Sequence, residues 1–503
     1  MFGNLADNLV IGMTTAFSLS NLMYCFAGVF LGTLIGVLPG IGALAALSLL
    51  LPVTFHLDAT SAIVMLAGVY YGASYGGSTA SILLNLPGTP SAAVACLDGY
   101  PMAKQGRAGV ALFMTTIASF FGGSIGIIIM MLFAPVIVGF ALHFGPAEYF
   151  AMMVLGLIAA STVSAGAPMK GIAMVLLGVL LGIVGADIET GQLRLGFGIT
   201  YLYDGISLVA IAMGLFGVSE VISSINQIKR GHVDRKSITL RSMVPTKDDV
   251  KRSIAPMVRG AGIGSFFGAL PGTGGVIASF MAYAVEKKVA KDPSRFGKGA
   301  IEGLTAPESA NNAADQTAFI PTMTLGIPGN VVMALMVAAL MIHGITPGPQ
   351  LMTKNPELFW GLIMSFWIGN VLLLVLNIPL IGLWVRVLAV PYHLLYPAVL
   401  MFICIGVYSI NNSVFDIYMM LFFGLIGYGM RLLDFQPAPL LLGFVLGPLM
   451  EENLRRALLI SRGDFSVFIT RPISGVFVVL SALILAWASW TAFRPQQRKL
   501  IPG

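Results

Sequence analysis

Long stretches without a formal charge follow one another along most of this chain. A membrane-spanning helix needs about 20 predominantly apolar residues, so a stretch of twice that length must fold back or hold two spans. The long stretches are residues 8–57, 59–97, 108–147, 149–169, 260–285, 316–353, 358–385, 387–415 and 472–493. Shorter ones, which could form tilted or partial spans, are 171–186, 205–219, 417–430 and 435–450. The pattern predicts an all-α polytopic membrane protein with about 12 membrane helices, some of them incomplete.

Composition indicates the same class. Of the 503 residues, 57% are hydrophobic and 10% are charged, whereas a typical soluble domain carries about 25% charged residues. A soluble globule needs more charge to cover its surface, and a disordered chain has a much lower apolar content. The 3 cysteines are too few for a disulfide scaffold. Metal-ligand spacings, a nucleophile elbow and a phosphate-binding loop are all missing from the sequence, so we expect neither an enzyme nor a resident cofactor.

The chain repeats a pair of Pro-Gly motifs. GVLPGIG (36–42) is matched by GALPGTG (268–274), and each motif lies inside a long apolar stretch. A further Pro-Gly follows each of them, in NLPGTP (85–90) and in GIPGN (326–330). Because the order is the same in both parts, we predict that the chain consists of two homologous membrane repeats.

Positive charge is concentrated between these repeats. The net charge is +6, and residues 229–252 hold a large share of the Lys and Arg. Loops rich in Lys and Arg stay on the cytoplasmic side of a membrane. Nucleic-acid binding is not expected, because no groove-reading motif accompanies the charge. We interpret 229–252 as a basic cytoplasmic linker between a first membrane repeat, 1–228, and a second membrane repeat, 253–503.

Loop charges indicate that the second repeat is inverted. The loop TFHLDAT (54–60) has no Lys or Arg, whereas its counterpart EKKVAKDPSRFGKG (286–299) is rich in them. The contrast reverses, more weakly, between DGYPMAKQGRAG (98–109) and TPGPQLMTKNPE (346–357). We therefore predict two inverted repeats. The orientation of the C-terminal tail stays open, because the apparent span 472–493 has Arg residues on both sides.

Pro-Gly inside a membrane segment has a physical consequence. Proline removes a helix hydrogen bond and glycine admits backbone shapes that other residues resist. Interrupted backbone at membrane depth must be buried in protein or line a wet cavity. There, half-helix N-termini attract anions, and freed carbonyls hold Na⁺ or H⁺. Each Pro-Gly could instead be a tight turn between two complete spans, but two matched pairs favour a transport site.

A polar cluster precedes the last Pro-Gly. The segment APESANNAADQT (306–317) contains Glu308, Asn311, Asn312 and Asp315. Asparagine and carboxylate oxygens suit Na⁺, so an ion or gate site is one interpretation. An ordinary polar loop is the other.

Longer segments around these motifs resemble the large membrane subunit of the tripartite tricarboxylate transporters, the TctA family. The segments that carry the likeness are GVLPGIG, residues 70–112, GALPGTGGVIASF, residues 296–330, NIPLIGLWVR (377–386) and LLGFVLGPLMEENLRRAL (441–458). The likeness covers essentially the whole chain, and DGYPMA, APESANNA and GFVLG with EENLRR are its most specific parts.

The resemblance implies a multi-pass protein of the bacterial inner membrane. It implies a small four-helix membrane subunit and a periplasmic solute-binding protein as partners. It also implies import of citrate-like di- or tricarboxylates by symport with Na⁺ or H⁺. The architecture of the TctA family is similar to that of the ion transporter superfamily. This similarity implies re-entrant hairpins, broken helices and elevator-type alternating access. The alternatives are a stand-alone anion symporter or a channel, and, less favoured, a membrane-embedded transferase that would use Glu308 and Asp315.

On this hypothesis the carboxylate docks between the second and fourth breaks. The predicted substrate-binding residues are Asn85, Pro87, Gly88, Thr89, Pro90, Ser91, Pro328, Gly329 and Asn330. The predicted hairpin-tip or cation-binding residues are Pro39, Gly40, Gly42, Pro271, Gly272, Thr273, Gly274, Glu308, Asn311, Asn312 and Thr324. A charged side chain at the membrane centre costs about 2.5 kcal/mol or more. Because no Lys or Arg lies near a break in the sequence, we expect co-transported cations to neutralise the anion.

Overall fold

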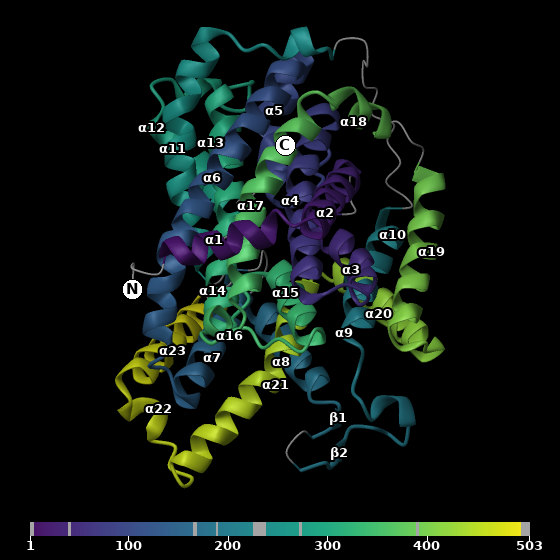
Figure 1. The fold of residues 1–503 in the computed structure, drawn as a ribbon, viewed down its shortest axis with the longest axis vertical. Coiled ribbons are helices and arrows are strands. Elements are labelled where there is room, and N and C mark those ends of the chain that lie inside the picture. The colour runs from purple at the N-terminus through teal and green to yellow at the C-terminus, as the bar shows by residue number, and fades with distance from the viewer. Residues whose placement is uncertain are drawn as a thin grey trace. The chain divides into compact units, whose positions relative to one another are not determined.

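The computed structural model describes residues 5–38, 42–163, 168–187, 190–224, 238–270, 274–388 and 392–493. Most of these residues are helical, as Figure 1 shows. The chain forms two compact units. Unit 1 comprises Met1–Leu142 and Ser207–Tyr428, and unit 2 comprises His143–Ile206 and Gly429–Gly503.

Five of the described helical segments are long and apolar enough to cross a membrane. They are Leu19–Val37, Ser91–Ala141, Pro356–Asn377, Val414–Leu432 and Pro472–Trp490. Shorter apolar helices are Gly42–Thr54, Pro146–Ala159, Pro168–Gly182, Leu208–Ser223, Val331–Ile342 and Val399–Asn411. The predicted class, an all-α polytopic membrane protein, is therefore confirmed. The count of about 12 membrane helices, the inversion and the boundaries of the two repeats stay predictions.

Unit 1 contains most of the helices. In its first segment they are α1 (Leu5–Ala16), α2 (Leu19–Val37), α3 (Gly42–Thr54), α4 (Ala59–Leu84), η2 (Ser91–Val94), α5 (Ala95–Met102), η3 (Ala103–Arg107) and α6 (Ala108–Ala141). Its second segment starts with α9 (Leu208–Ala212), η5 (Met213–Val218), α10 (Ser219–Ser224), η7 (Leu240–Met243), α11 (Lys247–Ala269), α12 (Gly274–Val289), η8 (Pro293–Arg295), α13 (Ile301–Thr317) and α14 (Phe319–Leu325). It continues with α15 (Val331–Ile342), α16 (Leu351–Lys354), α17 (Pro356–Asn377), α18 (Ile381–Val387), α19 (Tyr392–Asn411) and α20 (Val414–Leu432), the last of which runs into unit 2.

Helices α2 and α4 pack along each other through glycine. One face of α2 carries three glycines at intervals of four residues, each against a backbone carbonyl of α4. A Cβ at these glycines would lie 2.1, 2.3 and 2.4 Å from that oxygen, closer than any real Cβ contact. The glycines are Gly28, Gly32 and Gly36, and the carbonyls belong to Met65, Val69 and Ala73. Only glycine permits so close an approach of two helix backbones.

The same packing recurs between α11 and α13. Three of the glycines of α11 lie against carbonyls of α13, and a Cβ on them would be 2.2, 2.1 and 2.4 Å from the oxygens. The glycines are Gly260, Gly264 and Gly268, and the carbonyls belong to Ala306, Ala310 and Ala314. Each glycine of α11 lies the same number of residues after its counterpart in α2. Each carbonyl residue of α13 likewise lies a constant number of residues after its counterpart in α4. Helices α11, α12 and α13 lie together in Figure 1.

The ends of the paired helices also match. Helices α2 and α11 end at Leu38 and Leu270, which have extended backbones with ψ of 112° and 127°. Each of these leucines precedes a proline in the sequence, and a residue before proline avoids the helical region. Helix α4 and the short helix α14, which follows α13, end at Asn85 and Gly326, both left-handed, with φ of 58° and 72°. Every predicted Pro-Gly therefore begins one or two residues after the cap of a helix.

Unit 2 is smaller, and its described part is built around the helices α7, α8, α21 and α23. Its elements are α7 (Pro146–Val163), α8 (Pro168–Gly182), the strands β1 (Gly185–Ala186) and β2 (Leu193–Arg194), η4 (Thr200–Leu202), α21 (Pro437–Ile460), α22 (Val467–Thr470) and α23 (Pro472–Phe493). The strands pair antiparallel, with Gly185 opposite Arg194. Glycine again sets the packing, because a Cβ on Gly178 of α8 would be 2.0 Å from the Leu440 carbonyl oxygen of α21.

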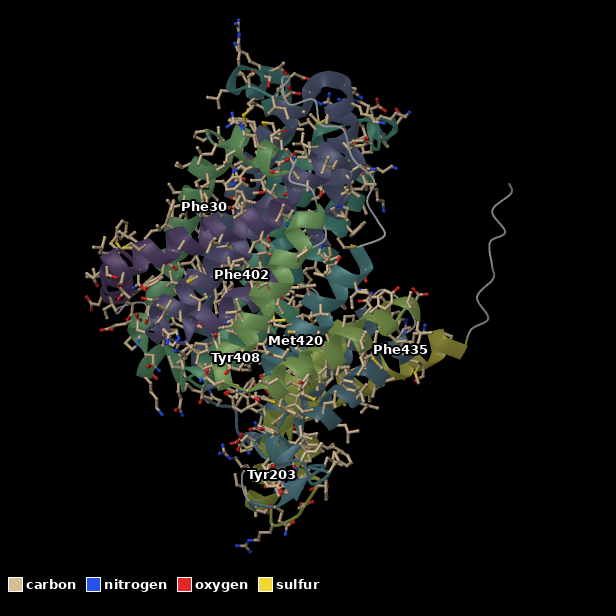
Figure 2. The ribbon with its side chains drawn as sticks, turned by 90° about the vertical axis from the view of Figure 1, so that its right-hand side faces the viewer. Phe30, Tyr203, Phe402, Tyr408, Met420 and Phe435 are labelled. Atoms are coloured by element: carbon tan, nitrogen blue, oxygen red, sulfur yellow. The ribbon has the colours of Figure 1, made fainter. Side chains whose placement is uncertain are left out.

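Apolar side chains cover the outer face of α19 in unit 1. Met401, Phe402, Ile405 and Tyr408 are all more than 40% exposed, and they recur at the spacing of one helix face. Figure 2 shows Phe402 and Tyr408 on this helix. Such a stripe is typical of a helix that faces hydrocarbon or another membrane subunit.

Candidate functional site

The first and third predicted breaks are only partly described. Five of the predicted tip residues lie outside the described residues: Pro39, Gly40, Pro271, Gly272 and Thr273. Gly42 and Gly274, which follow them, begin α3 and α12 with φ of +71° and +62°. Glycine enters this left-handed region without steric cost. The backbone therefore explains why both motifs end in glycine.

The second break, residues 85–91, is in contact with the first. The Gly88 N–H donates to the Gly77 carbonyl of α4 over 3.3 Å. A Cβ on Gly88 would lie 2.5 Å from the Gly36 carbonyl oxygen near the end of α2. A Cβ on Gly42 would lie 3.9 Å from the Gly88 carbonyl oxygen. Both ends of the first break are thus neighbours of Gly88.

The polar groups of this break divide by exposure. The side chains of Asn85, Pro87 and Pro90 are exposed, whereas Thr89 is buried. The hydroxyls of Thr89 and Ser91 lie 3.2 Å apart and share a hydrogen bond. The predicted substrate-binding residues of this break therefore offer an accessible segment together with an inner pair of hydroxyls.

The fourth break, residues 326–330, contacts the third in the same way. A Cβ on Gly329 would lie 3.6 Å from the Gly268 carbonyl oxygen, near the end of α11. A Cβ on Gly274 would lie 3.4 Å from the Cβ of Asn330. The Asn330 side chain accepts from the Met333 N–H over 2.9 Å and so caps α15. Pro328 is buried with its neighbours in this break.

The polar cluster before the fourth break is not a loop. Residues 306–317 belong to α13, and every residue of that helix except Glu302 is buried. The ordinary-loop interpretation is therefore wrong. Helix α13 can bury so many polar residues because neighbouring helices supply the hydrogen-bond partners that buried polar groups require.

Two carboxylates of α13 face the same side. Glu308 and Asp315 are 2% and 3% exposed, and a separation of seven residues is close to two helical turns. Asp315 accepts from the Tyr70 hydroxyl over 2.5 Å and from the Ser74 hydroxyl over 2.6 Å. Two buried carboxylate oxygens are thus each held by a hydroxyl.

Glu308 has a similar arrangement. It accepts from the Ser78 hydroxyl of α4 over 2.7 Å and from the Ser119 hydroxyl of α6 over 3.2 Å. Within the described part of the chain, no ion pair involves Glu308 or Asp315. Buried carboxylates without a paired cation are costly and are rarely kept for stability alone.

The donors on α4 follow helical spacing. Tyr70, Ser74 and Ser78 recur every four residues, so they line one face of α4. Tyr70 meets Asp315 and Ser78 meets Glu308, so the order of contacts along α4 is opposite to that along α13. The two helices are therefore antiparallel where they meet.

Asn311 completes this group. It is 1% exposed, and neither its Oδ1 nor its Nδ2 has a hydrogen-bond partner. We call the following residues the polar centre: Tyr70, Ser74, Ser78, Ser119, Glu308, Asn311 and Asp315. Sequence reasoning singled out only part of it. The four-residue spacing of hydroxyls in YYGASYGGS was the available signal for Tyr70, Ser74 and Ser78, whereas nothing pointed to Ser119.

Two further predicted cation ligands bond within their own helices. The Asn312 side chain donates to the Glu308 carbonyl over 3.0 Å, and the Thr324 hydroxyl donates to the Ile320 carbonyl over 2.6 Å. This is the usual local bonding of such residues in helices. Both side chains are buried, and the structure places neither in the polar centre.

Asp98, which sequence reasoning passed over, holds a connection in place. Its Oδ1 accepts from the backbone N–H groups of Gly297, Gly299 and Ala300 over 2.9, 2.8 and 2.8 Å. Its Oδ2 accepts from the Tyr283 hydroxyl over 3.0 Å. Asp98 therefore ties α5 to the segment that joins α12 to α13.

In unit 2, an ionic cluster joins the β1–β2 hairpin to α21. Asp187 accepts from Arg455 over 2.9 Å and also pairs with Arg194. Arg194 binds both oxygens of Glu451, at 3.0 and 2.9 Å. These residues border a cavity of about 340 Å³. Positive and negative groups are balanced in the cluster, so we interpret it as a structural link between the hairpin and α21.

A metal centre is not found in the described ranges, which contain no group of three or more His, Cys, Asp or Glu residues arranged to hold a metal ion. Oxygen-rich sites for monovalent cations are a different case, because amide, hydroxyl and backbone oxygens serve them as well.

Comparisons with known proteins give a consistent result. The model of the "Tripartite tricarboxylate transporter TctA family" matches residues 22–442. An Agrobacterium vitis protein described as "Uncharacterized 52.8 kDa protein in TAR-I ttuC' 3'region" is 48% identical over 497 residues, 99% of each chain. Another, "Uncharacterized protein in TAR-II ttuC' 3'region", is 55% identical over 234 residues, 46% of this chain and 97% of that protein. No solved structure matches. Because the family match spans most of the sequence, the chain belongs to the TctA family of tripartite tricarboxylate transporters.

Proposed function

We propose that this chain is the membrane subunit through which a binding-protein-dependent secondary transporter imports a citrate-like di- or tricarboxylate by cation symport. Membership of the TctA family supports the coarser statement, that it is a membrane subunit of a tripartite tricarboxylate transporter. The polar centre carries the finer proposal. Its two buried carboxylates lack an ion pair within the described residues, and intramembrane carboxylates are typical of ion and proton pathways.

Electrostatics supports symport. A di- or trianion that enters the membrane beside two further carboxylates needs opposite charge close by. A buried charged side chain at the membrane centre costs about 2.5–3.5 kcal/mol, and no arginine or lysine bonds to the polar centre in the described ranges. Cations that enter with the substrate would supply the compensation, and they would move inward with it.

The breaks supply the substrate site in this proposal. The carboxylate would dock between residues 85–91 and 328–330, where backbone N–H groups and helix ends favour an anion. Two features support this placement. The second break offers an accessible segment with a hydroxyl pair behind it, Thr89 and Ser91. The fourth break ends at Asn330, the N-cap of α15.

We further propose that the two repeats are inverted and that the transport domain moves as in elevator-type alternating access. The matched helix pairs α2–α4 and α11–α13, and the antiparallel contact of α4 with α13, support inversion. Ser74 and Asp315 lie at equivalent positions of the two repeats and are bonded to each other. Contact between equivalent positions is expected around an internal twofold axis, as in other inverted-repeat transporters.

The remaining partners and the location follow from the proposed role. A tripartite system needs a periplasmic solute-binding protein and a small membrane subunit, which we take to have four helices. The protein would be a multi-pass component of the bacterial inner membrane. The apolar stripe on α19 is a surface that could meet lipid or that subunit.

Reconstitution tests this function. The three-component system would be placed in proteoliposomes, and uptake of labelled citrate, malate and succinate would be measured under imposed Na⁺ or proton gradients. We expect saturable uptake that needs the binding protein and accumulates substrate in proportion to one cation gradient.

The other outcomes separate the alternatives. Uptake that ignores both gradients would refute symport. Saturable uptake without the binding protein would identify a stand-alone symporter, and non-saturating flux would identify a channel.

A further inference from the structure

The surroundings of Asp315 differ from those of Glu308. Both carboxylates accept two hydroxyls. Next to Asp315, however, lies a buried amide side chain, Asn311, whose two polar atoms have no partner. A buried polar group left without a hydrogen bond costs about 1–3 kcal/mol. An unsatisfied amide beside an unpaired carboxylate is therefore an unusual combination that a bound ligand would satisfy.

Gly275 shows that the two side chains face the same point. A Cβ on Gly275 would lie 2.5 Å from Asn311 Oδ1 and 3.1 Å from Asp315 Oδ1. Both oxygens thus converge on the first turn of α12. Any residue with a side chain at position 275 would push into these two oxygens, so glycine is what lets the start of α12 lie this close to both of them.

We propose that Asp315 Oδ1 and Asn311 Oδ1 bind one Na⁺ beside Gly275, and that Tyr70 and Ser74 orient the carboxylate for it. A carboxylate and an amide oxygen are hard ligands that suit an alkali cation, and one negative charge balances one Na⁺. Each carboxylate oxygen keeps a lone pair after it has accepted its hydroxyl. This inference deepens the proposed function and rests on it for its role in transport.

The position of this site explains how cation and substrate would be coupled. Gly274, the residue before Gly275, lies against Asn330 of the fourth break. A Cβ added at Gly274 would be 3.4 Å from the Cβ of Asn330. A cation held by Asp315 and Asn311 would therefore fix the start of α12 next to the proposed substrate site. Binding of either ligand would then favour binding of the other, as linkage requires.

Sodium binding to the purified full-length subunit tests the inference without substrate or transport. Thermal unfolding in detergent would be followed in NaCl and in choline chloride of equal ionic strength. A ligand that binds only the folded state raises the unfolding midpoint with its concentration. We expect Na⁺, but not choline, to raise the midpoint of the wild-type protein, and Asp315→Asn to lose this response.

Further variants guard against misfolding of Asp315→Asn. Ser74→Ala keeps the carboxylate and should raise the half-saturating Na⁺ concentration about tenfold, as loss of a partner that orients a ligand does. Gly275→Ala should abolish the response. Gly262→Ala on α11 is its matched control, because a Cβ there meets nothing within 4 Å, and it should respond like the wild type.

A wild-type midpoint that ignores Na⁺, or a full response in both Asp315→Asn and Gly275→Ala, would overturn the site. These results are independent of the proposed function. Cation-driven uptake that survives in Asp315→Asn would move the cation site elsewhere and leave the function standing. Sodium binding at Asp315 in a protein that imports no carboxylate would leave the cation site standing and refute the proposed function.

Discussion

Replacing glycine with alanine should have different effects in the second and in the fourth break. Gly88 and Gly329 occupy equivalent positions of the two Pro-Gly motifs, and the motifs alone give no reason for the two glycines to respond differently to an added side chain. The structure predicts otherwise. The Cβ of Gly88→Ala would lie 2.5 Å from both the Gly36 carbonyl oxygen and the Gly77 Cα. The Cβ of Gly329→Ala would make its nearest contact, with the Gly268 carbonyl oxygen, at 3.6 Å.

The difference in cost follows from these distances. Non-bonded heavy atoms are most stable at about 3.5–4.0 Å, so Gly88→Ala must move the break by about 1 Å away from both α2 and α4. Both contacts are backbone atoms and cannot rotate away. Overpacking of this kind costs about 1–3 kcal/mol. The Gly329→Ala methyl group falls at an ordinary contact distance and needs no rearrangement.

The assay combines uptake with stability. Both variants would be reconstituted with their partners, and initial uptake of the transported carboxylate would be compared with thermal unfolding in detergent. We expect Gly88→Ala to reduce uptake at least about tenfold, the change that 1.4 kcal/mol produces, and to lower the unfolding midpoint. Gly329→Ala should stay close to the wild type in both. Equal damage from the two variants, or wild-type behaviour of Gly88→Ala, would refute the reasoning.

Three further predictions concern other contacts. Asp98→Asn keeps the shape of the side chain but weakens the acceptor for three backbone N–H groups, so it should lower the unfolding midpoint by the equivalent of about 1–3 kcal/mol. Ser78→Ala leaves Glu308 with one hydroxyl donor, and a cost of about 1–3 kcal/mol in the same measurement is expected. The third concerns acid stability: burial alone would raise the pKa of Asp249, but hydrogen bonds from Arg107 and Thr246 lower it below its usual 3.8. Because a lowered pKa stabilises the folded state above the unfolded pKa and this is lost as pH falls, Arg107→Gln should shift the acid limb of unfolding to higher pH.

Much of the fold was predictable because helix ends are local. The leucines before Pro39 and Pro271 leave the helical region for steric reasons, and the glycines that end both motifs take up left-handed backbone. Uncharged length and low charge fixed the membrane class. The repeated four-residue glycine spacing of α2 and α11 was also present in the sequence, although the facing carbonyls that give it meaning are visible only in the structure.

The polar centre could be predicted only in part. Glu308, Asn311 and Asp315 stand out as polar residues in an apolar context, yet the segment that holds them was equally compatible with a loop. Their partners lie more than 180 residues away in sequence, so no local pattern connects them. Ser119 is one hydroxyl within a long apolar helix, and its role depends entirely on the packing of α6 against α13.

The most direct test of the account is the substrate accumulation ratio under an imposed cation gradient in proteoliposomes that hold the complete system. With a tenfold inward gradient of the coupling cation, wild-type protein should concentrate the carboxylate at least about tenfold, the free energy stored in that gradient being about 1.4 kcal/mol per ion. Asp315→Asn should only equilibrate the substrate or not carry it. Accumulation by Asp315→Asn to the wild-type ratio would contradict the claim that this buried carboxylate couples the cation to the carboxylate.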